Sequence, residues 1–459
     1  MNSTLCFPRP SSQTSASSLP KSFLVRSPIP NFQELQKGYI LLKVDKFGWS
    51  ANNVTYQALG EHPHFRYYDF HPSPTSSSAS VAPQTHGVVP VWGFGTVVAS
   101  AHPSVAVGER LYGYFAPAKY LVLPIDEKDV NKFSMYVPRP HLPADRRVYN
   151  QIQRCSSDPL YIREKEDLTM LYRPLFWTSY WCEDWLACSG YRGGCEYILI
   201  SSASSKTAFC LAYCFLMKVE KERQKKSSAT SEYRNMSNIR VIGLTSKTNL
   251  DFTRQLGLYY EVYDYDSFLS AFHAHHKTDT VLSKSQSRWI YIDVAGNQTL
   301  NSRIYTHFAS PYTASKLIAT VSLGMTNLVP GEGRAKNIEW NTLNTKSSMM
   351  ENNTTFSSSS LGFWPVTEQF FLPEWLAIRR VQLTPAQMLD MQKEAWQSLM
   401  RDCPGWVKLE YVYGGEQVKA AYETMVNSSR GLGPDKGWIW SMWDAGGPDV
   451  GQKAVKAKL

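Results

Sequence analysis

The stretch ILISSASSKTAFCLAYCFL at residues 198–216 decides the fold of the region around it. The apolar run Ile198–Ile200 favours a buried strand, and the small polar residues after it favour a tight loop. From Ala208 onward apolar residues recur at helical spacing, with Leu211 and Phe215 on one face. A strand, loop and helix in this order present backbone N–H groups to a phosphate. Such loops normally depend on glycine, and this loop has none.

The same alternation of strand and helix continues towards the C-terminus. Repeated strand–helix–strand units need right-handed crossovers and build a parallel sheet. Residues 175–330 are therefore predicted to form a doubly wound, Rossmann-type domain. Strands are predicted at Ile198–Ser202, Ile239–Leu244, Tyr260–Tyr263, Trp289–Val294 and Leu317–Ser322, and helices at 205–217, 249–256, 266–275 and 298–308.

The rest of the chain has a different character. Residues 38–60 and 88–124 contain short β-rich runs punctuated by glycine and proline. The C-terminal part mixes helical and strand-like segments, and we expect it to complete the β-rich domain. The predicted organisation is a disordered leader at 1–33, a β-rich domain at 34–174 with 363–459, and a low-complexity insertion at 331–362.

Charge and hydropathy limit the function classes. The chain has 459 residues and a net charge of +9, and three short basic tracts, 1–33, 218–226 and 452–459, carry that excess. Because the remainder is close to neutral, the sequence argues against a nucleic-acid partner. It also contains no apolar run long enough to span a membrane. We expect a cytoplasmic protein, with an organelle transit peptide as the alternative interpretation of the basic, Ser-rich N-terminus.

The loop within the opening stretch is the first candidate cofactor site. Its helix begins near Ser204 or Ser205, so the unpaired N–H groups and the helix dipole favour an anion there. Hydroxyl groups and one lysine can add side-chain donors. The alternative is that the serines are helix N-caps. The candidate residues are Ser202, Ala203, Ser204, Ser205, Lys206 and Thr207.

The end of the second predicted strand points to the type of dinucleotide. A cofactor with a free ribose 2′-hydroxyl needs Asp or Glu at this position. The sequence VIGLTSKTN (241–249) instead offers Thr245, Ser246, Lys247 and Asn249, which suit a ribose 2′-phosphate. NADP(H) is therefore the predicted cofactor. The alternative is a polar turn that caps the next helix.

Several segments, in their order, resemble the medium-chain dehydrogenase/reductase superfamily and its zinc-free, quinone-reductase-like branch. They are FGWSANNVTYQALG (47–60), VWGFGTVVAS (91–100), VAVGERLYGY (105–114), the stretch at 198–216, VIGLTSKTNLDFTRQLG (241–257), YIDVAGN (291–297) and KLIATVSLG (316–324). FGWSANNVTY, VGERLYGY, YRPLFWTSY (172–180) and SSASSKTA (201–208) are similar to an uncharacterised family within that superfamily. The resemblance implies an α/β protein with a β-rich GroES-like domain plus a doubly wound Rossmann-type parallel-sheet domain. It also implies a small-molecule substrate and a homodimer.

The sequence departs from the metal-dependent members of that superfamily. Their Gly-His-Glu motif is replaced by PVWGFG (90–95), and their four-cysteine lobe is missing. Zinc needs an organised set of Cys, His or carboxylate ligands. No metal site is therefore predicted.

Without zinc, the chemistry implied by the resemblance is hydride transfer to a carbonyl, a quinone or an activated alkene. The SANNVTY segment lines the nicotinamide end in similar proteins, and Tyr56 can donate a proton there. The alternative is that the asparagines form a turn and Tyr56 packs in the core. A second open alternative is a dinucleotide-binding or scaffold protein without turnover. The catalytic candidates are Ser50, Asn53, Tyr56 and Tyr180, and Gly324 completes the cofactor-binding set.

Overall fold

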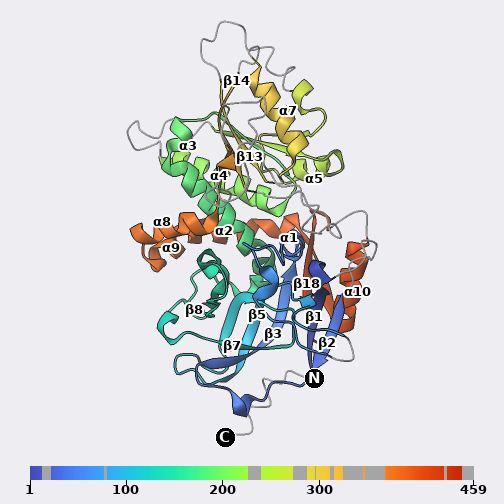
Figure 1. Cartoon of the computed structure of the whole chain (residues 1–459). Helices are drawn as coiled ribbons and strands as arrows, with labels where there is room; N and C mark the ends of the chain where they lie inside the picture. The colour runs from blue at the N-terminus through green and yellow to red at the C-terminus, as the bar shows by residue number, and fades with distance from the viewer. Residues whose placement is uncertain are drawn as a thin grey trace. The chain divides into compact units, whose positions relative to one another are not determined.

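The computed structural model describes residues 1–12, 22–76, 80–225, 239–271, 287–294, 296–310, 315–323, 345–346, 367–427 and 432–446. The chain divides into two compact units, whose elements are labelled in Figure 1. The first unit comprises Met1–Pro174, Leu328–Ile338 and Met400–Leu459. The second comprises Leu175–Asn327 and Glu339–Leu399.

The first unit is built on two β-sheets. An eight-stranded sheet has the order β17-β18-β3-β5-β6-β9-β8, with β7 paired to β3, and a three-stranded sheet has the order β2-β1-β4. This β-rich architecture confirms the prediction. The strands are β1 (Asn2–Pro8), β2 (Phe23–Ser27), β3 (Tyr39–Trp49), β4 (His86–Gly87), β5 (Val91–Ser100), β6 (Arg110–Phe115), β7 (Tyr120–Pro124), β8 (Ser134–Tyr136), β9 (Gln151–Arg154), β17 (Lys408–Tyr413) and β18 (Lys436–Ser441). Among its helices are α1 (Ala51–Ala58), η3 (Tyr67–Asp69), η5 (Ala144–Asn150) and α10 (Gly415–Val426).

Large aromatic side chains join the early and late strands of the first unit. Trp49 of β3 stacks on Trp440 of β18, with ring centroids 4.9 Å apart and an interplanar angle of 16°. Both side chains are almost completely buried. Burial of aromatic surface is the largest contribution that single side chains make to a core. The C-terminal strand is therefore an integral part of the first unit.

Within 1–33, the described residues form strands β1 and β2, where a disordered leader was predicted. Strand β1 lies between β2 and β4, and Leu5, Cys6 and Phe7 have no exposed surface. Arg9 forms an ion pair with Asp69 at 3.0 Å. The apolar run is short, so the Ser-rich, basic composition around it concealed a buried strand.

The second unit contains a seven-stranded parallel sheet with the order β12-β11-β10-β13-β14-β16-β15. Numbered along the chain from β10, the seven strands have the order 3-2-1-4-5-7-6. The first five positions, 3-2-1-4-5, match the order of the doubly wound dinucleotide-binding fold. The Rossmann-type prediction is confirmed. The strands are β10 (Tyr197–Ile200), β11 (Arg240–Thr245), β12 (Glu261–Asp264), β13 (Ser287–Asp293), β14 (Ser315–Ser322), β15 (Thr345–Lys346) and β16 (Thr367–Gln369). The helices include α2 (Glu166–Cys188), which begins in the first unit, α3 (Gly190–Gly193), α4 (Lys206–Lys225), α5 (Leu250–Gln255), α7 (Gln298–Ala309), α8 (Leu372–Gln382) and α9 (Pro385–Asp402).

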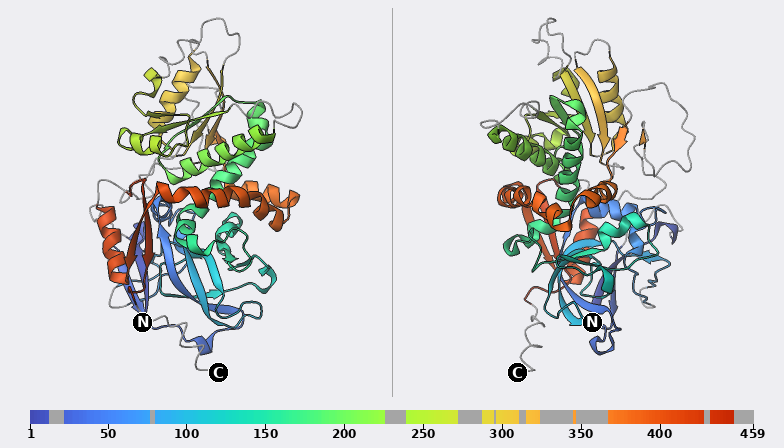
Figure 2. Two further views of the ribbon diagram at one scale, coloured as in Figure 1. Left: turned by 180° about the vertical axis from the view of Figure 1, so that it is seen from behind. Right: turned by 90° about the vertical axis from the view of Figure 1, so that its left-hand side faces the viewer.

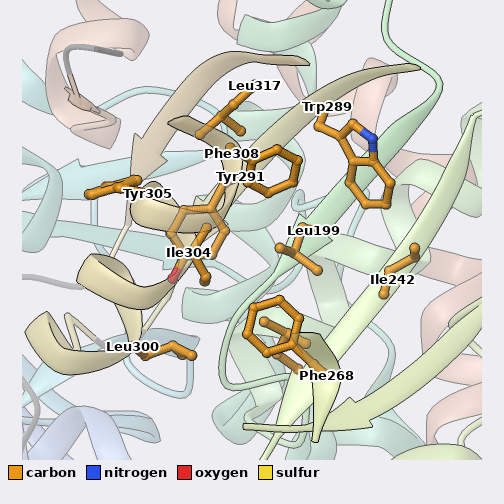
Figure 3. Close-up of a cluster of buried hydrophobic side chains, with 11 residues drawn as sticks. Leu199, Ile242, Phe268, Trp289, Tyr291, Leu300, Ile304, Tyr305, Phe308 and Leu317 are labelled. Atoms are coloured by element: carbon orange, nitrogen blue, oxygen red, sulfur yellow. The ribbon is translucent and has the colours of Figure 1, made fainter. Parts of the chain in front are cut away.

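Helices lie on both faces of this parallel sheet (Figure 2). On one face α7 packs Ile304 and Phe308 against Trp289 and Leu199 (Figure 3). Side chains alternate along a strand, so Ile198 and Ile200 point to the opposite face. Both are fully buried. Burial on two faces explains why these strands have nearly continuous apolar sequences.

The structure also moves part of the C-terminal region to the second unit. We expected 363–459 to complete the β-rich domain, yet β16, α8 and α9 lie in the second unit up to Leu399. Strand β16 has only three residues, Thr-Glu-Gln, so no apolar run marks it as a strand. It is a strand because its backbone pairs with that of β14. Among the described residues, no helix is long and apolar enough to cross a membrane.

Candidate functional site

The candidate site begins where β10 and β13 end. These two strands are neighbours in the sheet although they are its first and fourth strands along the chain, so the strand order reverses between them. Ligands of open parallel sheets bind outside the carboxyl ends of the strands at such a reversal. The loop Ser201–Ser205 leads from β10 into α4 at this point. The predicted cofactor loop therefore lies where the fold places a ligand.

The loop is packed tightly against β11. The N–H of Ala203 donates to the carbonyl of Leu244 at 2.8 Å. A Cβ atom built on Gly243 would lie 2.8 Å from Cβ of Ala203, which is closer than real contacts allow. A glycine on the neighbouring strand thus supplies the close approach that glycines in the loop usually supply. Ser202 has a left-handed backbone with φ of 51°, a conformation that normally favours glycine.

Ser205 is the N-cap of α4. Its Oγ accepts the N–H of Ala208 at 3.3 Å, and its carbonyl accepts the N–H of Phe209 at 3.0 Å. The capping alternative from the sequence therefore describes Ser205. Capping one N–H still leaves the positive end of the helix dipole directed at the loop.

Ser204 joins the loop to the end of β11. Its Oγ accepts the hydroxyl proton of Thr245 at 3.0 Å and an amide proton of Asn249 at 3.2 Å. A hydroxyl has two acceptor positions and one proton. Because both acceptor positions are filled, Ser204 can act towards a further group only as a donor. Thr245 and Asn249 therefore orient Ser204, a role that residues 41 and 45 positions away in the chain did not reveal.

The remaining cofactor candidates differ in exposure. Lys206 is the first residue of α4 and is half-buried, and the carbonyl of Thr207 accepts the hydroxyl proton of Ser179 at 3.0 Å. Ser246 is half-buried and Lys247 is exposed at the end of β11. Gly324 lies outside the described residues.

A buried carboxyl group at the same edge of the sheet was not predicted. Asp293 ends β13 and has no exposed surface. It accepts hydrogen bonds from Ser201 Oγ at 2.9 Å, from the N–H of Gly296 at 3.0 Å and from the Asn301 amide at 2.7 Å. The hydroxyl of Tyr291 donates to Asn301 Oδ1 at 2.6 Å. The motif YIDVAGN, with a carboxylate at a strand end and a glycine after it, was the available signal. This network fixes the first and fourth strands to each other at the reversal of strand order.

Two of the catalytic candidates form the start of α1. Ser50 is the N-cap residue, and its N–H donates to Asn53 Oδ1 at 2.9 Å. The amide nitrogen of Asn53 donates to the carbonyl of Pro90 at 2.9 Å. Asn53 is almost fully buried, so both polar atoms of its side chain serve the backbone. Asn53 therefore caps a helix, whereas the alternative interpretation placed it in a turn.

Tyr56 lies inside an aromatic cluster in the first unit. Its ring centroid is 4.6 Å from that of Tyr67 and 5.3 Å from that of Tyr114. Its hydroxyl oxygen accepts the indole N–H of Trp92 at 3.3 Å. Burial, followed by the nearby Tyr149, raises the pKa of Tyr56 well above its ordinary value. Tyr56 is therefore a neutral phenol and not a phenolate at neutral pH.

Tyr180 lies in the part of α2 that belongs to the second unit. Its hydroxyl donates to the carbonyl of Met391 in α9 at 2.7 Å, so it ties two helices together. Burial is the main reason why its pKa is raised. The structure does not bring Tyr180 together with Ser50, Asn53 and Tyr56 in one unit.

Within the residues that the structure describes, no group of three or more His, Cys, Asp or Glu side chains is arranged to hold a metal ion. His71 lies in the core of the first unit, where burial and then Arg139 lower its pKa to about 3. Its Nε2 lies 3.0 Å from the carbonyl oxygen of Tyr114. The histidine is therefore a hydrogen-bonded core residue.

Comparison with known proteins identifies the family. Residues 47–430 match the protein family described as "Protein of unknown function (DUF2855)". The chain belongs to this family. No curated protein matches the DUF2855 chain in sequence. The match covers most of the chain.

Solved structures similar to this DUF2855 protein have low sequence identity. CurA from Vibrio vulnificus has a TM-score of 0.47 and 11% identity, over 96% of this chain and 98% of that chain. The yhdH oxidoreductase from Salmonella enterica, in complex with NADP, has a TM-score of 0.44 and 11% identity, over 96% and 99%. A putative NADPH:quinone reductase from Bacillus thuringiensis has a TM-score of 0.44 and 12% identity, over 96% and 98%. The doubly wound assignment itself comes from the strand order of the second unit.

Proposed function

We propose that this protein is a zinc-independent, NADP(H)-dependent oxidoreductase that transfers hydride to a carbonyl, a quinone or an activated alkene. The observation that carries the proposal is the donor-only hydroxyl of Ser204 at the reversal of strand order. A hydroxyl donor, a helix N-terminus and Lys206 at one place suit the pyrophosphate of a dinucleotide. The bound nicotinamide supplies the hydride.

The end of β11 supports NADP(H) over NAD(H). Residues 245–249 contain hydroxyl groups and Lys247 but no carboxylate. A carboxylate at this position accepts a hydrogen bond from the ribose 2′-hydroxyl and repels a 2′-phosphate. The exposed Lys247 can reach a ligand at the edge of the sheet, whereas Thr245 is buried and orients Ser204.

A charge reversal tests the cofactor preference. Lys247→Glu is expected to weaken NADPH binding by about tenfold or more, because it replaces a favourable charge contact worth about 1.5–3 kcal/mol with repulsion. NADH binding should change little. Calorimetric titration of both cofactors measures this. Lys316→Glu is the matched control, because Lys316 is an exposed lysine at the opposite end of a strand in the same sheet.

Two substitutions test the loop. Lys206→Ala and Ser204→Ala should weaken NADPH and NADH to the same extent, because the pyrophosphate is common to both. Absence of NADPH binding at millimolar concentration would refute the oxidoreductase proposal. If Lys247→Glu changes the affinities for NADPH and NADH equally, Lys247 does not contact the ribose 2′-phosphate.

The second candidate function is a dinucleotide-binding or scaffold protein without turnover. It is favoured by the structural use of the candidate catalytic groups, since Asn53 caps α1 and Tyr180 joins α2 to α9. Oxidation of NADPH in the presence of quinones, enals and enones separates the two functions. NADPH binding without oxidation across this panel would support the scaffold.

A further inference from the structure

Strand β17 ends the eight-stranded sheet of the first unit, and its outer edge is unpaired among the described residues. On its inner side it pairs in parallel with β18. The N–H of Lys408 donates to the carbonyl of Asp435 at 2.7 Å, and the N–H of Gly414 donates to that of Ser441 at 3.0 Å. Backbone groups alternate in direction along a strand, so the residues between these two ends that point outward are Leu409, Tyr411 and Tyr413.

The strand lacks the features by which natural edge strands avoid pairing. With six residues, β17 is longer than the other strands that end a described sheet. It contains no proline, and its register with β18 is unbroken. Its two charged side chains, Lys408 and Glu410, lie on one face, and Lys436 approaches Glu410 to 3.6 Å. A long edge without proline or a bulge is a template for a further strand.

Two tyrosine side chains stand exposed beside this edge. Tyr411 is 47% exposed and Tyr413 is 46% exposed. Their rings are parallel within 4°, with centroids 6.3 Å apart. The Tyr411 hydroxyl donates to Asp167 Oδ2 at 2.9 Å, which holds its ring in place. Leu409 is half-buried and shares their face of the sheet. Ordered tyrosines next to an unpaired edge are typical of an interface.

We propose that β17 pairs antiparallel with β17 of a second copy of this chain, about a two-fold axis at Tyr411. A two-fold contact uses the same patch on both copies. Tyr411 then faces the partner's Tyr411, and Leu409 faces the partner's Tyr413. Facing residues of this kind exchange both N–H···O bonds, so every outward residue of β17 gains a backbone partner. This pairing does not depend on the proposed oxidoreductase function.

Charge and strand length select this axis over its neighbours. An axis at Glu410 places the two Glu410 carboxylates opposite each other, and like charges in that position destabilise a sheet. An axis at Val412 leaves Leu409 without a partner strand, because helix α10 begins at Gly415. The axis at Tyr411 sets Glu410 against the partner's Val412. It also sets the exposed tyrosines against tyrosine and leucine, which are stabilising cross-strand pairs.

Sedimentation of the full-length protein without cofactor tests the contact. The protein should change from monomer to dimer over about 1–100 µM, because the contact is smaller than a standard interface. A protein that remains monomeric throughout this range would overturn the proposal. Since no cofactor is present, the result is separate from that of the NADPH titration.

Tyr411→Lys tests the position of the axis. It places two like charges opposite each other and should raise the dissociation constant of the dimer at least tenfold. Tyr260→Lys is the matched control, because Tyr260 is 57% exposed and precedes β12, an edge strand of the other sheet. It should leave the dissociation constant unchanged. Equal effects of the two substitutions would place the contact elsewhere and refute the pairing.

Disulfide cross-linking tests the register in a Cys188→Ser background, since Cys188 is the exposed cysteine among the described residues. Tyr411→Cys should form a covalent dimer under mild oxidation. Facing residues of a hydrogen-bonded antiparallel pair have Cα atoms about 5.5 Å apart, which suits a disulfide. Tyr413→Cys should not, because its two copies would lie about 13 Å apart along the strands. Any other pattern of cross-linking in these two variants would refute the proposed pairing.

Discussion

At the scale of single residues, Glu183 of α2 is a buried acid with a raised pKa. It is 5% exposed, and the Tyr191 hydroxyl donates to its carboxyl group. Burial raises the pKa of Glu183 to about 7, against opposing effects of Lys218 and of the Tyr191 hydrogen bond. Tyr191 itself has a left-handed backbone with φ of 52°. The carboxyl group and the strained turn at Tyr191 are therefore linked.

Glu183 should make stability fall as pH rises. At pH 4 the carboxyl group is protonated in the folded and the unfolded states, so it does not lower the free energy of unfolding. Between about pH 4.5 and 7 the unfolded chain releases this proton while the folded chain keeps it, so the free energy of unfolding decreases. Above pH 7 the loss is constant and amounts to at most about 3 kcal/mol.

Urea unfolding between pH 4 and pH 8 measures this effect. Glu183→Gln should be free of the loss, because Gln stays neutral and can still accept from Tyr191. The advantage of the variant should grow over that pH window. Glu196→Gln is the control, because Glu196 is an exposed acid, and its free energy of unfolding should follow that of the natural protein. If that free energy changes with pH in the same way in all three proteins, Glu183 is not the cause.

At the scale of elements, the cofactor loop depends on the strand beside it. Gly243→Ala would place a methyl group 2.8 Å from Cβ of Ala203 and 3.0 Å from the Tyr259 ring. We expect a loss of about 1–3 kcal/mol in the free energy of unfolding, together with weaker NADPH binding because the loop moves. Denaturant titration and calorimetry measure the two effects.

The double variant Gly243→Ala with Ala203→Gly provides the control for this packing. Removing the Ala203 methyl group takes away the closest clash, so part of the lost stability should return. A double variant no more stable than expected from adding the two single effects would show that the pair does not couple.

The sequence predicted much at this scale because hydrophobic periodicity is local. The five strands from β10 to β14 lie close to their predicted positions, and four of them contain apolar runs, whereas β12 (EVYD) is short and partly polar. Strand β16 was missed because Thr367–Gln369 is polar and is a strand only through its neighbour β14. The sequence predicted Ser204 as a residue of the cofactor loop but not that it can only donate. The groups that donate to it, Thr245 and Asn249, lie far away in the chain.

At the scale of the whole molecule, the first unit draws on both ends of the chain. Phe7 of β1 lies 6.2 Å from Trp49 and 4.8 Å from Tyr422, measured between ring centroids. Basic and Ser-rich composition favoured a leader here, because composition averages over residues and hides a strand of seven. The aromatic partners of Phe7 come from distant segments that local sequence does not identify.

Phe7→Ala should therefore reduce the free energy of unfolding of the first unit by about 3–5 kcal/mol, as expected for a fully buried aromatic residue. Thermal and urea unfolding measure the change. Phe32→Ala is the matched control within 1–33, because Phe32 is 62% exposed. Equal, small effects of both substitutions would mean that β1 contributes little.

The pairing of β18 with β3 has a consequence for synthesis of the protein on the ribosome. Strand β3 emerges early, but its neighbour at Lys436–Ser441 is made only after the whole second unit. The strands of the second unit are all made within one continuous part of the chain, apart from β15 and β16. The nascent second unit can therefore begin to fold while the first still waits for its last strand. During that interval residues 47–49 of β3 lack their strand partner, and an unpaired apolar edge of this kind needs protection by a chaperone.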